Sequence, residues 1–331
     1  MVNKARYAVQ GQSMPTRRSR SIQLAPGSVL LILVSLSVAA CQPPPPAPEG
    51  LEEASRYMIR EFYKDDAVVG AGLTGLLNWY DESGYELVNQ GATAEDGGEA
   101  FQLEDITAAD ITSMPSFDDG RDLSKANGIV AISDMDCSWQ EAESYLVRSD
   151  QDVVFEEFNA YQRSFLSSRE LFEAATESLS FPNIATELAG LATGEVAITD
   201  EQSGGIMLTS NEVSSTDLGV TLDYSLVLHF RHGLYQVQDQ QLPVMMILSW
   251  LPSPVDSSSG SPTRFEQSYS IEVNYGLGDR TLRIFAVWTY VDSSFLGEDS
   301  SLWSIGAVNK SRDAAQRLSD ICAGEIAVPA E

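Results

Sequence analysis

The stretch FEQSYSIEVNYGLGDRTLRIFAVWTYV, residues 265–291, decides the fold of this chain. Residues 265–275 and 281–291 are rich in Val, Ile, Tyr and Leu with a period of two, which is typical of β-strands. The glycines of residues 276–279 suit a tight turn between them, so the stretch predicts a β-hairpin. We expect one apolar face on the first strand and another on the second, formed by Tyr269, Ile271, Val273 and Tyr275 and by Leu282, Ile284, Ala286 and Trp288.

Further strands are expected on the N-terminal side of this hairpin. The two-residue period begins near residue 206, and it predicts strands over residues 221–230 and 243–251. Residues 128–136, with the sequence GIVAISDMD, predict an earlier strand that is apolar on both faces. Together these segments predict an antiparallel sheet.

Helices are expected at both ends of the chain. Apolar residues recur at helical spacing in residues 51–64 and, over a shorter stretch, in residues 73–80. Ser138 followed by Glu141 is a capping-box pattern, which predicts the start of another helix. Residues 310–322 predict a terminal amphipathic helix. The fold class is therefore α+β, an antiparallel sheet with N-terminal helices and a C-terminal helix.

The order of strand, helices, antiparallel strands and terminal helix resembles the START-like helix-grip fold. The resemblance implies a curved sheet that wraps the C-terminal helix around an apolar cavity beside residues 310–322. It rests on the order of the elements and on no matching motif. The aromatic residues of the strands are expected in the core, with the lining of a ligand site as the alternative: Trp250, Tyr269, Tyr275, Phe285, Trp288 and Tyr290.

The N-terminus has the pattern of a processing signal. The basic residues Arg17, Arg18 and Arg20 precede the apolar run VLLILVSLSV, residues 29–38, which leads into Val38-Ala39-Ala40-Cys41. Ten apolar residues are too few for a transmembrane helix, which needs about 20. The junction resembles the signal peptide and lipobox of bacterial lipoproteins. The resemblance implies cleavage before Cys41, acylation of its thiol and, because Gln42 rather than Asp follows, delivery to the outer membrane of a Gram-negative cell envelope.

The remaining chain is interpreted in three parts after the signal peptide of residues 1–40. Residues 41–50 hold the lipidated cysteine and a proline-rich tether, whose composition favours an extended polyproline II conformation. Residues 51–127 are expected to form a helical and acidic loop segment. Residues 128–331 are expected to form the α+β domain.

The charge of the chain is strongly negative. The formal net charge is −28 at pH 7, and all 48 acidic residues follow Cys41, whereas five of the 20 basic residues precede it. Cleavage before Cys41 would leave 15 basic and 48 acidic residues, a net charge of −33. Such a charge repels nucleic acid and anionic headgroups, so nucleic acid is not expected among the partners.

The three cysteines divide into one plus two. If Cys41 is acylated, Cys137 and Cys322 remain as an even pair in an exported protein, where disulfides persist. We therefore predict a bridge between Cys137 and Cys322. Two buried free thiols are the alternative.

The segment AVVGAGLTG, residues 67–75, resembles the glycine-rich turn of dinucleotide-binding Rossmann proteins, because Gly70, Gly72 and Gly75 have its spacing. The context differs from that family. Only three apolar residues precede the first glycine as a strand, and Asn89 stands where an acidic residue should end the second strand. A glycine-rich connection between two helices is the preferred interpretation.

Both histidines lie on one expected strand, where the side chains of His229 and His232 would point to opposite faces and so could not share a metal ion. No partner for a Ser-His-Asp site is marked in the sequence. We assign no catalytic, cofactor-binding or metal-ligating residue, and we expect that the chain is not an enzyme.

The first hypothesis is a non-catalytic, membrane-anchored envelope lipoprotein with a binding or envelope-organising role. Its partners would be the membrane, through the acyl chains on Cys41, and an apolar small ligand or an envelope protein. One alternative is a hydrophobic-ligand carrier of helix-grip type. Another is a periplasmic enzyme that binds a dinucleotide through residues 70–75.

Overall fold

The computed structural model of the chain describes residues 45–93, 95, 98–111, 114, 121–166, 205–217, 220–293 and 301–330. The chain divides into the units Met1–Gln42 and Pro43–Glu331, and every described residue belongs to the second. Cys41 and the rest of the lipobox lie outside the described residues, as do residues 169–178, whose composition favours a helix. Within the described part, none of the helices is both long enough and apolar enough to cross a membrane.

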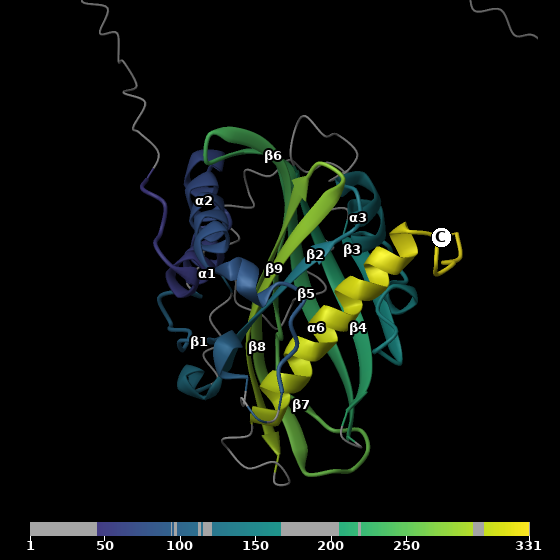
Figure 1. Cartoon of the computed structure of the whole chain (residues 1–331). Coiled ribbons are helices and arrows are strands. Elements are labelled where there is room, and N and C mark those ends of the chain that lie inside the picture. The colour runs from purple at the N-terminus through teal and green to yellow at the C-terminus, as the bar shows by residue number, and fades with distance from the viewer. Residues whose placement is uncertain are drawn as a thin grey trace, which may run out of the picture. The chain divides into compact units, whose positions relative to one another are not determined.

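A single antiparallel sheet forms the centre of the fold (Figure 1), with the strand order β1-β2-β9-β8-β6-β5-β4-β3 and β7 paired with β8 outside this path. The pairs β3–β4, β4–β5, β5–β6 and β8–β9 are antiparallel neighbours that are also consecutive among the described strands. The strands are β1 (Gln102–Leu103), β2 (Asn127–Met135), β3 (Ala160–Leu166), β4 (Gly205–Asp217), β5 (Val220–Val237), β6 (Gln240–Trp250), β7 (Val255–Asp256), β8 (Thr263–Leu277) and β9 (Arg280–Ser293).

The described α-helices are α1 (Leu51–Arg60), α2 (Asp66–Glu82), α3 (Trp139–Leu146) and α6 (Ser301–Cys322). Short 3-10 turns occur at Gly84–Leu87, Glu99–Phe101, Leu123–Lys125 and Gln151–Val153. The α+β class with its antiparallel sheet and C-terminal helix is confirmed. Ser138 caps α3 with Glu141 in the predicted capping box. Both α2 and α6 begin earlier than expected. In α2, close contacts with α1, β5 and Pro48 compensate for the low helix propensity of its glycines.

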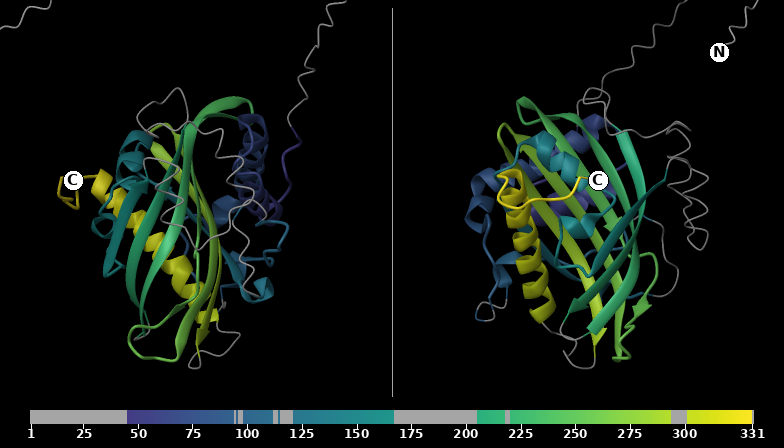
Figure 2. Two further views of the ribbon diagram at one scale, coloured as in Figure 1. Left: turned by 180° about the vertical axis from the view of Figure 1, so that it is seen from behind. Right: turned by 90° about the vertical axis from the view of Figure 1, so that its right-hand side faces the viewer.

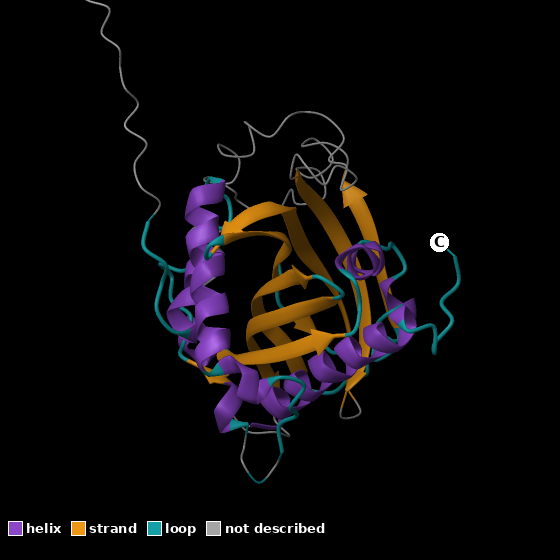
Figure 3. Cartoon of the chain, turned by 45° about the horizontal axis from the view of Figure 1, so that its top comes forward, coloured by secondary structure: helices purple, strands orange, loops and turns teal. Residues whose placement is uncertain are grey.

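Helices cover both faces of the curved sheet (Figures 2 and 3). One core joins α1 and α2 to one face, and its largest fully buried side chains include Trp250, Trp288, Tyr269 and Tyr275. A second core joins α3 and α6 to the other face, through residues such as Phe230 and Ile247. Double-sided burial explains why strands such as β2 read as continuous apolar runs rather than as alternating ones.

The central hairpin is confirmed, but the expected separation of its apolar residues into two faces is wrong. Tyr269 of β8 lies opposite Trp288 of β9, and Tyr275 lies opposite Leu282. Directly opposite residues of an antiparallel pair project to the same side, so both sets form one face under α1 and α2. The alternation within each strand could not reveal this, because the turn sets the register between strands.

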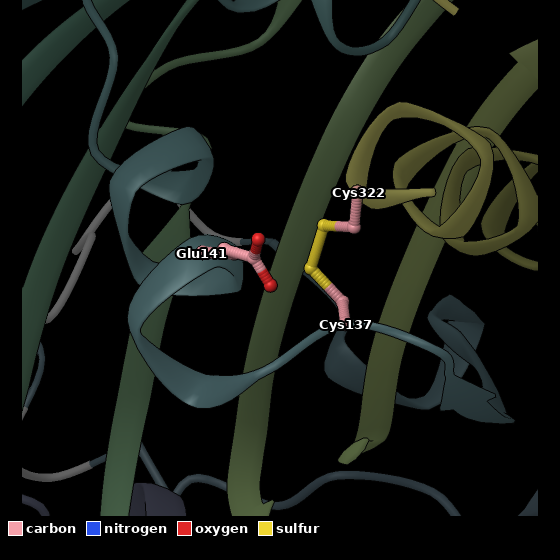
Figure 4. A group of neighbouring side chains, drawn as sticks. All are labelled: Cys137, Glu141 and Cys322. Atoms are coloured by element: carbon pink, nitrogen blue, oxygen red, sulfur yellow. A yellow bond between two sulfur atoms is a disulfide. The ribbon is translucent and has the colours of Figure 1, made fainter. Parts of the chain in front are cut away.

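The predicted disulfide joins Cys137, which follows β2, to Cys322, the last residue of α6 (Figure 4). The two Cα atoms are 5.4 Å apart, within the usual range for a disulfide. Cys137 is buried, and Cys322 packs against the second core. The bridge therefore fixes the C-terminal end of α6 to the sheet.

Candidate functional site

A pocket of about 290 Å³ lies between the sheet and α6. Residues of β3, β4, β5, β6, β8 and β9 form its floor, and Ala307, Lys310, Ser311 and Ala314 of α6 form its roof. A neighbouring pocket of about 180 Å³ shares several of these lining residues, including Ala307 and Lys310. Sites for small ligands are typically cavities of about 300 to 1,000 Å³, so the pair of pockets is of the right order for one.

The floor of the pocket follows from the two-residue period of the strands. On β9, Phe285 and Val287 line the pocket, whereas Ala286 and Trp288 between and after them enter the core under α1 and α2. The apolar character of both faces thus gives the pocket its hydrophobic walls. Aromatic side chains from four other segments complete these walls: Phe155, Phe158, Tyr161, Tyr224 and Phe265.

A band of hydroxyl groups crosses the middle of this floor. The hydroxyl of Ser249 on β6 is 2.6 Å from that of Ser270 on β8, and the hydroxyl of Ser268 is 3.2 Å from that of Thr289 on β9. All four residues line the pocket. The band offers both donors and acceptors to a ligand beside the apolar walls.

A buried ion pair lies at one end of the pocket. Nη2 of Arg283 donates to Oε2 of Glu272 at 2.7 Å, and the two side chains are only 9% and 10% exposed. Nη1 of Arg283 also donates to the hydroxyl and the carbonyl of Ser311, at 3.0 and 3.2 Å, and so links the sheet to α6. Burial acts to raise the pKa of Glu272, but Arg283 and a hydrogen bond from Asn274 outweigh it, and the pKa is lowered.

A second buried arginine, Arg163 of β3, lines the same pocket. Its Nε donates to Oδ1 of Asn211 at 3.0 Å, and its Nη1 donates to the carbonyl of Leu146. The guanidinium carbon lies 4.8 Å from the ring centre of Phe230, a cation–π distance. Arg163 also acts to lower the pKa of Glu272, so the two arginines and this carboxylate form one charged cluster.

Glu157 and Lys310 add to the charge of the pocket lining. Burial raises the pKa of Glu157, and the positive charges of Arg283 and Lys310 oppose that effect. Among the described residues, the titratable lining of the two pockets thus consists of three bases and two carboxylates apart from Tyr side chains. This balance is opposite in sign to that of the whole chain, in which acidic residues outnumber basic ones 48 to 20.

The two histidines lie on opposite faces of β5, as predicted. His229 is fully buried toward α1 and α2, where its Nδ1 is hydrogen-bonded to the hydroxyl of Tyr63. Burial lowers the pKa of His229 to about 3, so the ring is neutral at physiological pH. Nδ1 of His232 lies on the other side, 3.3 Å from Oε1 of Glu143 on α3. Neither histidine lines the pocket.

The glycines of residues 70–75 lie inside α2, which corrects both interpretations of that segment. They are neither a connection between helices nor a phosphate-binding turn, because α1 rather than a strand precedes α2. Their role is close packing, since an added Cβ would overlap a neighbour at each: Gly70 against Gln236 of β5, Gly72 against Met58 and Tyr57 of α1, and Gly75 against Pro48.

Cys137, Cys322 and Glu141 each offer a possible metal-ligand atom within 4.8 Å of the others (Figure 4). Both sulfur atoms belong to the disulfide, however, and the thiolate is the form of cysteine that binds metals. Glu141 already accepts the capping-box hydrogen bonds from Ser138. The arrangement is thus a structural bridge beside a helix N-terminus.

The charged end of the pocket was missed in the sequence, although a signal was present. Glu272 lies four residues before the turn of residues 276–279, and Arg283 lies four residues after it, so the two are diagonal neighbours across the hairpin. A hairpin therefore brings them near each other, and opposite charges on a buried sheet face require pairing. Sequence comparison adds no assignment to this geometry, since no protein-family model and no curated protein matches the chain.

Proposed function

We propose that this chain is a lipoprotein of the bacterial cell envelope, anchored through Cys41, whose folded unit binds an apolar small molecule without chemically changing it. The anchor is supported by the lipobox Val38-Ala39-Ala40-Cys41, and Gln42 favours the outer membrane. The observation that carries the binding role is the pocket between the sheet and α6.

Three features of the pocket favour binding over a purely structural role. Protein interiors are normally close-packed, so a space of about 290 Å³ between sheet and helix is larger than ordinary packing leaves. Its aromatic walls offer apolar contact area, and its hydroxyl band and charged end offer the few polar groups that fix the orientation of a ligand. The space also lies beside residues 310–322, where a ligand carrier of helix-grip type requires a cavity.

A neutral fluorophore tests the binding role. Every described element belongs to the unit Pro43–Glu331, so this unit can be titrated with N-phenyl-1-naphthylamine, whose emission rises in apolar surroundings. We expect saturable binding of about one molecule per chain. Ala307→Trp fills the roof shared by both pockets and should weaken binding at least tenfold.

The matched control is Gln316→Trp, which adds the same side chain on the exposed side of α6 and should bind as the unaltered chain does. Urea unfolding would verify that both variants fold. Absence of binding to the unaltered unit, or equal binding by the folded Ala307→Trp variant, would overturn the proposed binding role.

A further inference from the structure

We infer that the pocket selects amphiphiles with an anionic headgroup, a carboxylate or a phosphate, which lies beside Arg283 while the apolar tail extends toward the N-terminal half of α6. This inference rests on the proposed binding function and names the class of ligand. It follows from the sign of the charge in the pocket, from one hydrogen-bond donor, and from a change of polarity along β9.

The pocket concentrates positive charge in an acidic protein. Among the described residues, the lining holds the bases Arg163, Arg283 and Lys310 and the carboxylates Glu157 and Glu272, one base more than acids. Buried charges are stable only when paired and hydrogen-bonded, so an anionic group is the ligand that completes this balance. A cationic headgroup would instead add to the excess.

One donor of Arg283 has no partner among the described residues. The guanidinium has three donor nitrogens, of which Nη1 donates to Ser311 and Nη2 donates to Glu272. The Nε atom is buried and makes no hydrogen bond, although the side chain is only 9% exposed and lines the pocket. A buried N–H without an acceptor is unfavourable, and an anionic oxygen is the strongest acceptor that a ligand can supply.

Charged side chains become fewer along the pocket in one direction. Every second residue of β9 from Arg283 to Val291 lines one of the two pockets, a distance of roughly 26 Å at about 3.3 Å per residue. The far end is lined by Leu222, Val291 and Trp303 together with the neutral polar residues Ser215 and Ser304, and Lys310 is the one charged residue among the described lining of that second pocket. A charged end followed by an apolar end matches the shape of an amphiphile with a single chain.

Displacement of the neutral fluorophore by three competitors of equal chain length tests this inference. Dodecanoate, dodecyl phosphate and dodecanol are compared on the unit Pro43–Glu331, all below their micellar concentrations. We expect at least one anion to compete at least tenfold better than dodecanol. A stronger effect of dodecanoate would identify a carboxylate headgroup, and a stronger effect of dodecyl phosphate would identify a phosphate.

Charge variants locate the selectivity. Lys310→Gln, and Arg283→Gln combined with Glu272→Gln so that no buried carboxylate is left unpaired, should each reduce the preference for the anion to about threefold or less while the fluorophore still binds. Lys64→Gln is the control, because it removes one positive charge at an exposed position outside the pocket. The Lys64→Gln variant should still bind the anion at least tenfold better than dodecanol.

Two failures can be told apart. If the fluorophore does not bind, the proposed binding function fails. If the fluorophore binds but dodecanol displaces it as well as both anions do, the function stands and the headgroup inference is overturned. The inference is also overturned if the folded Lys310→Gln variant keeps the full preference for the anion.

Discussion

Arg231 is the side chain that holds the connection between α1 and α2 against the sheet. Its Nη1 donates to the carbonyls of Phe62 and Lys64 at 2.7 and 2.5 Å, and its Nη2 donates to Asp66 at 2.6 Å. The Asp66 side chain is 76% exposed, so that ion pair adds little, and the two carbonyl bonds dominate. The buried guanidinium thus satisfies two backbone carbonyls of the connection between the two helices.

Arg231→Met should lower the free energy of unfolding by about 3 kcal/mol, because two carbonyls lose a charged donor. Urea unfolding of the unit Pro43–Glu331 measures this change. The control is Arg312→Met, which removes an exposed arginine paired with its neighbour Asp313 and should cost less than about 0.5 kcal/mol. Equal losses in the two variants would contradict the role given to Arg231.

His229 should make the stability of the fold depend on pH. Burial lowers the pKa of His229 from 6.5 to about 3, so below pH 6.5 the unfolded chain binds a proton that the folded chain excludes. The free energy of unfolding therefore falls as the pH decreases from 6.5 toward 3. The loss from this one group is about 2 kcal/mol at pH 5.

His229→Gln removes this titration while keeping a polar group near Tyr63. The variant starts from lower stability, but its free energy of unfolding should change less between pH 6.5 and pH 5 than that of the unaltered chain. The carboxylates are the same in the variant and in the unaltered chain, so they contribute equally to the pH dependence of the free energy of unfolding in both. Parallel stability curves for the two chains would show that His229 is not protonated on unfolding.

Among the described elements, α6 is held at its C-terminal end by a disulfide bond. Its last residue is bonded to Cys137, and the bridge closes a separation of 185 residues. The chain-entropy account gives an upper stabilisation of about 5 kcal/mol for such a loop. In the oxidised protein, Cys137 and Cys322 should resist alkylation until a reductant is added.

Mass spectrometry after alkylation measures that protection directly. Cys137→Ala combined with Cys322→Ala should unfold at a lower urea concentration than the bridged chain, and reduction should change the midpoint of the bridged chain alone. Rapid alkylation of both residues without reductant would refute the bridge.

The elements were largely predictable from the sequence, because strand period and helix capping are local signals. β8 and β9 follow from alternation around Gly278, whose φ of 81° suits the turn. The start of α2 did not follow, because Gly70 and Gly72 are unfavourable in an isolated helix, and contacts with α1 compensate for that cost only in the folded state.

The candidate site was less predictable than the elements. The predicted position of a cavity beside residues 310–322 agrees with the pocket under α6. The residues that give it chemistry come from β3, β8, β9 and α6, and only the pairing order places Arg163 and Arg283 in one pocket. The hairpin sequence alone predicts that Glu272 and Arg283 lie near each other. It does not predict which other strands pair beside the hairpin and complete the pocket.

At the scale of the whole molecule, the proposed membrane anchor lies outside the unit that folds. The unit Pro43–Glu331 contains all described packing, and Cys41 lies before it. Cys41→Ser should therefore abolish labelling by a palmitate analogue and leave an unprocessed precursor, while the disulfide and the unfolding midpoint of the folded unit stay unchanged. Retention of the label in the variant would overturn the lipobox assignment.

The bridge between Cys137 and Cys322 has a consequence for damaged molecules. It encloses α3, β3 to β9 and α6 in one covalent ring and leaves α1, α2, β1 and β2 on the N-terminal arm. A single proteolytic cut anywhere in the ring releases no fragment until the sulfur atoms are reduced. A nicked molecule would keep its mass on a non-reducing gel and would remain attached to whatever holds its N-terminal arm.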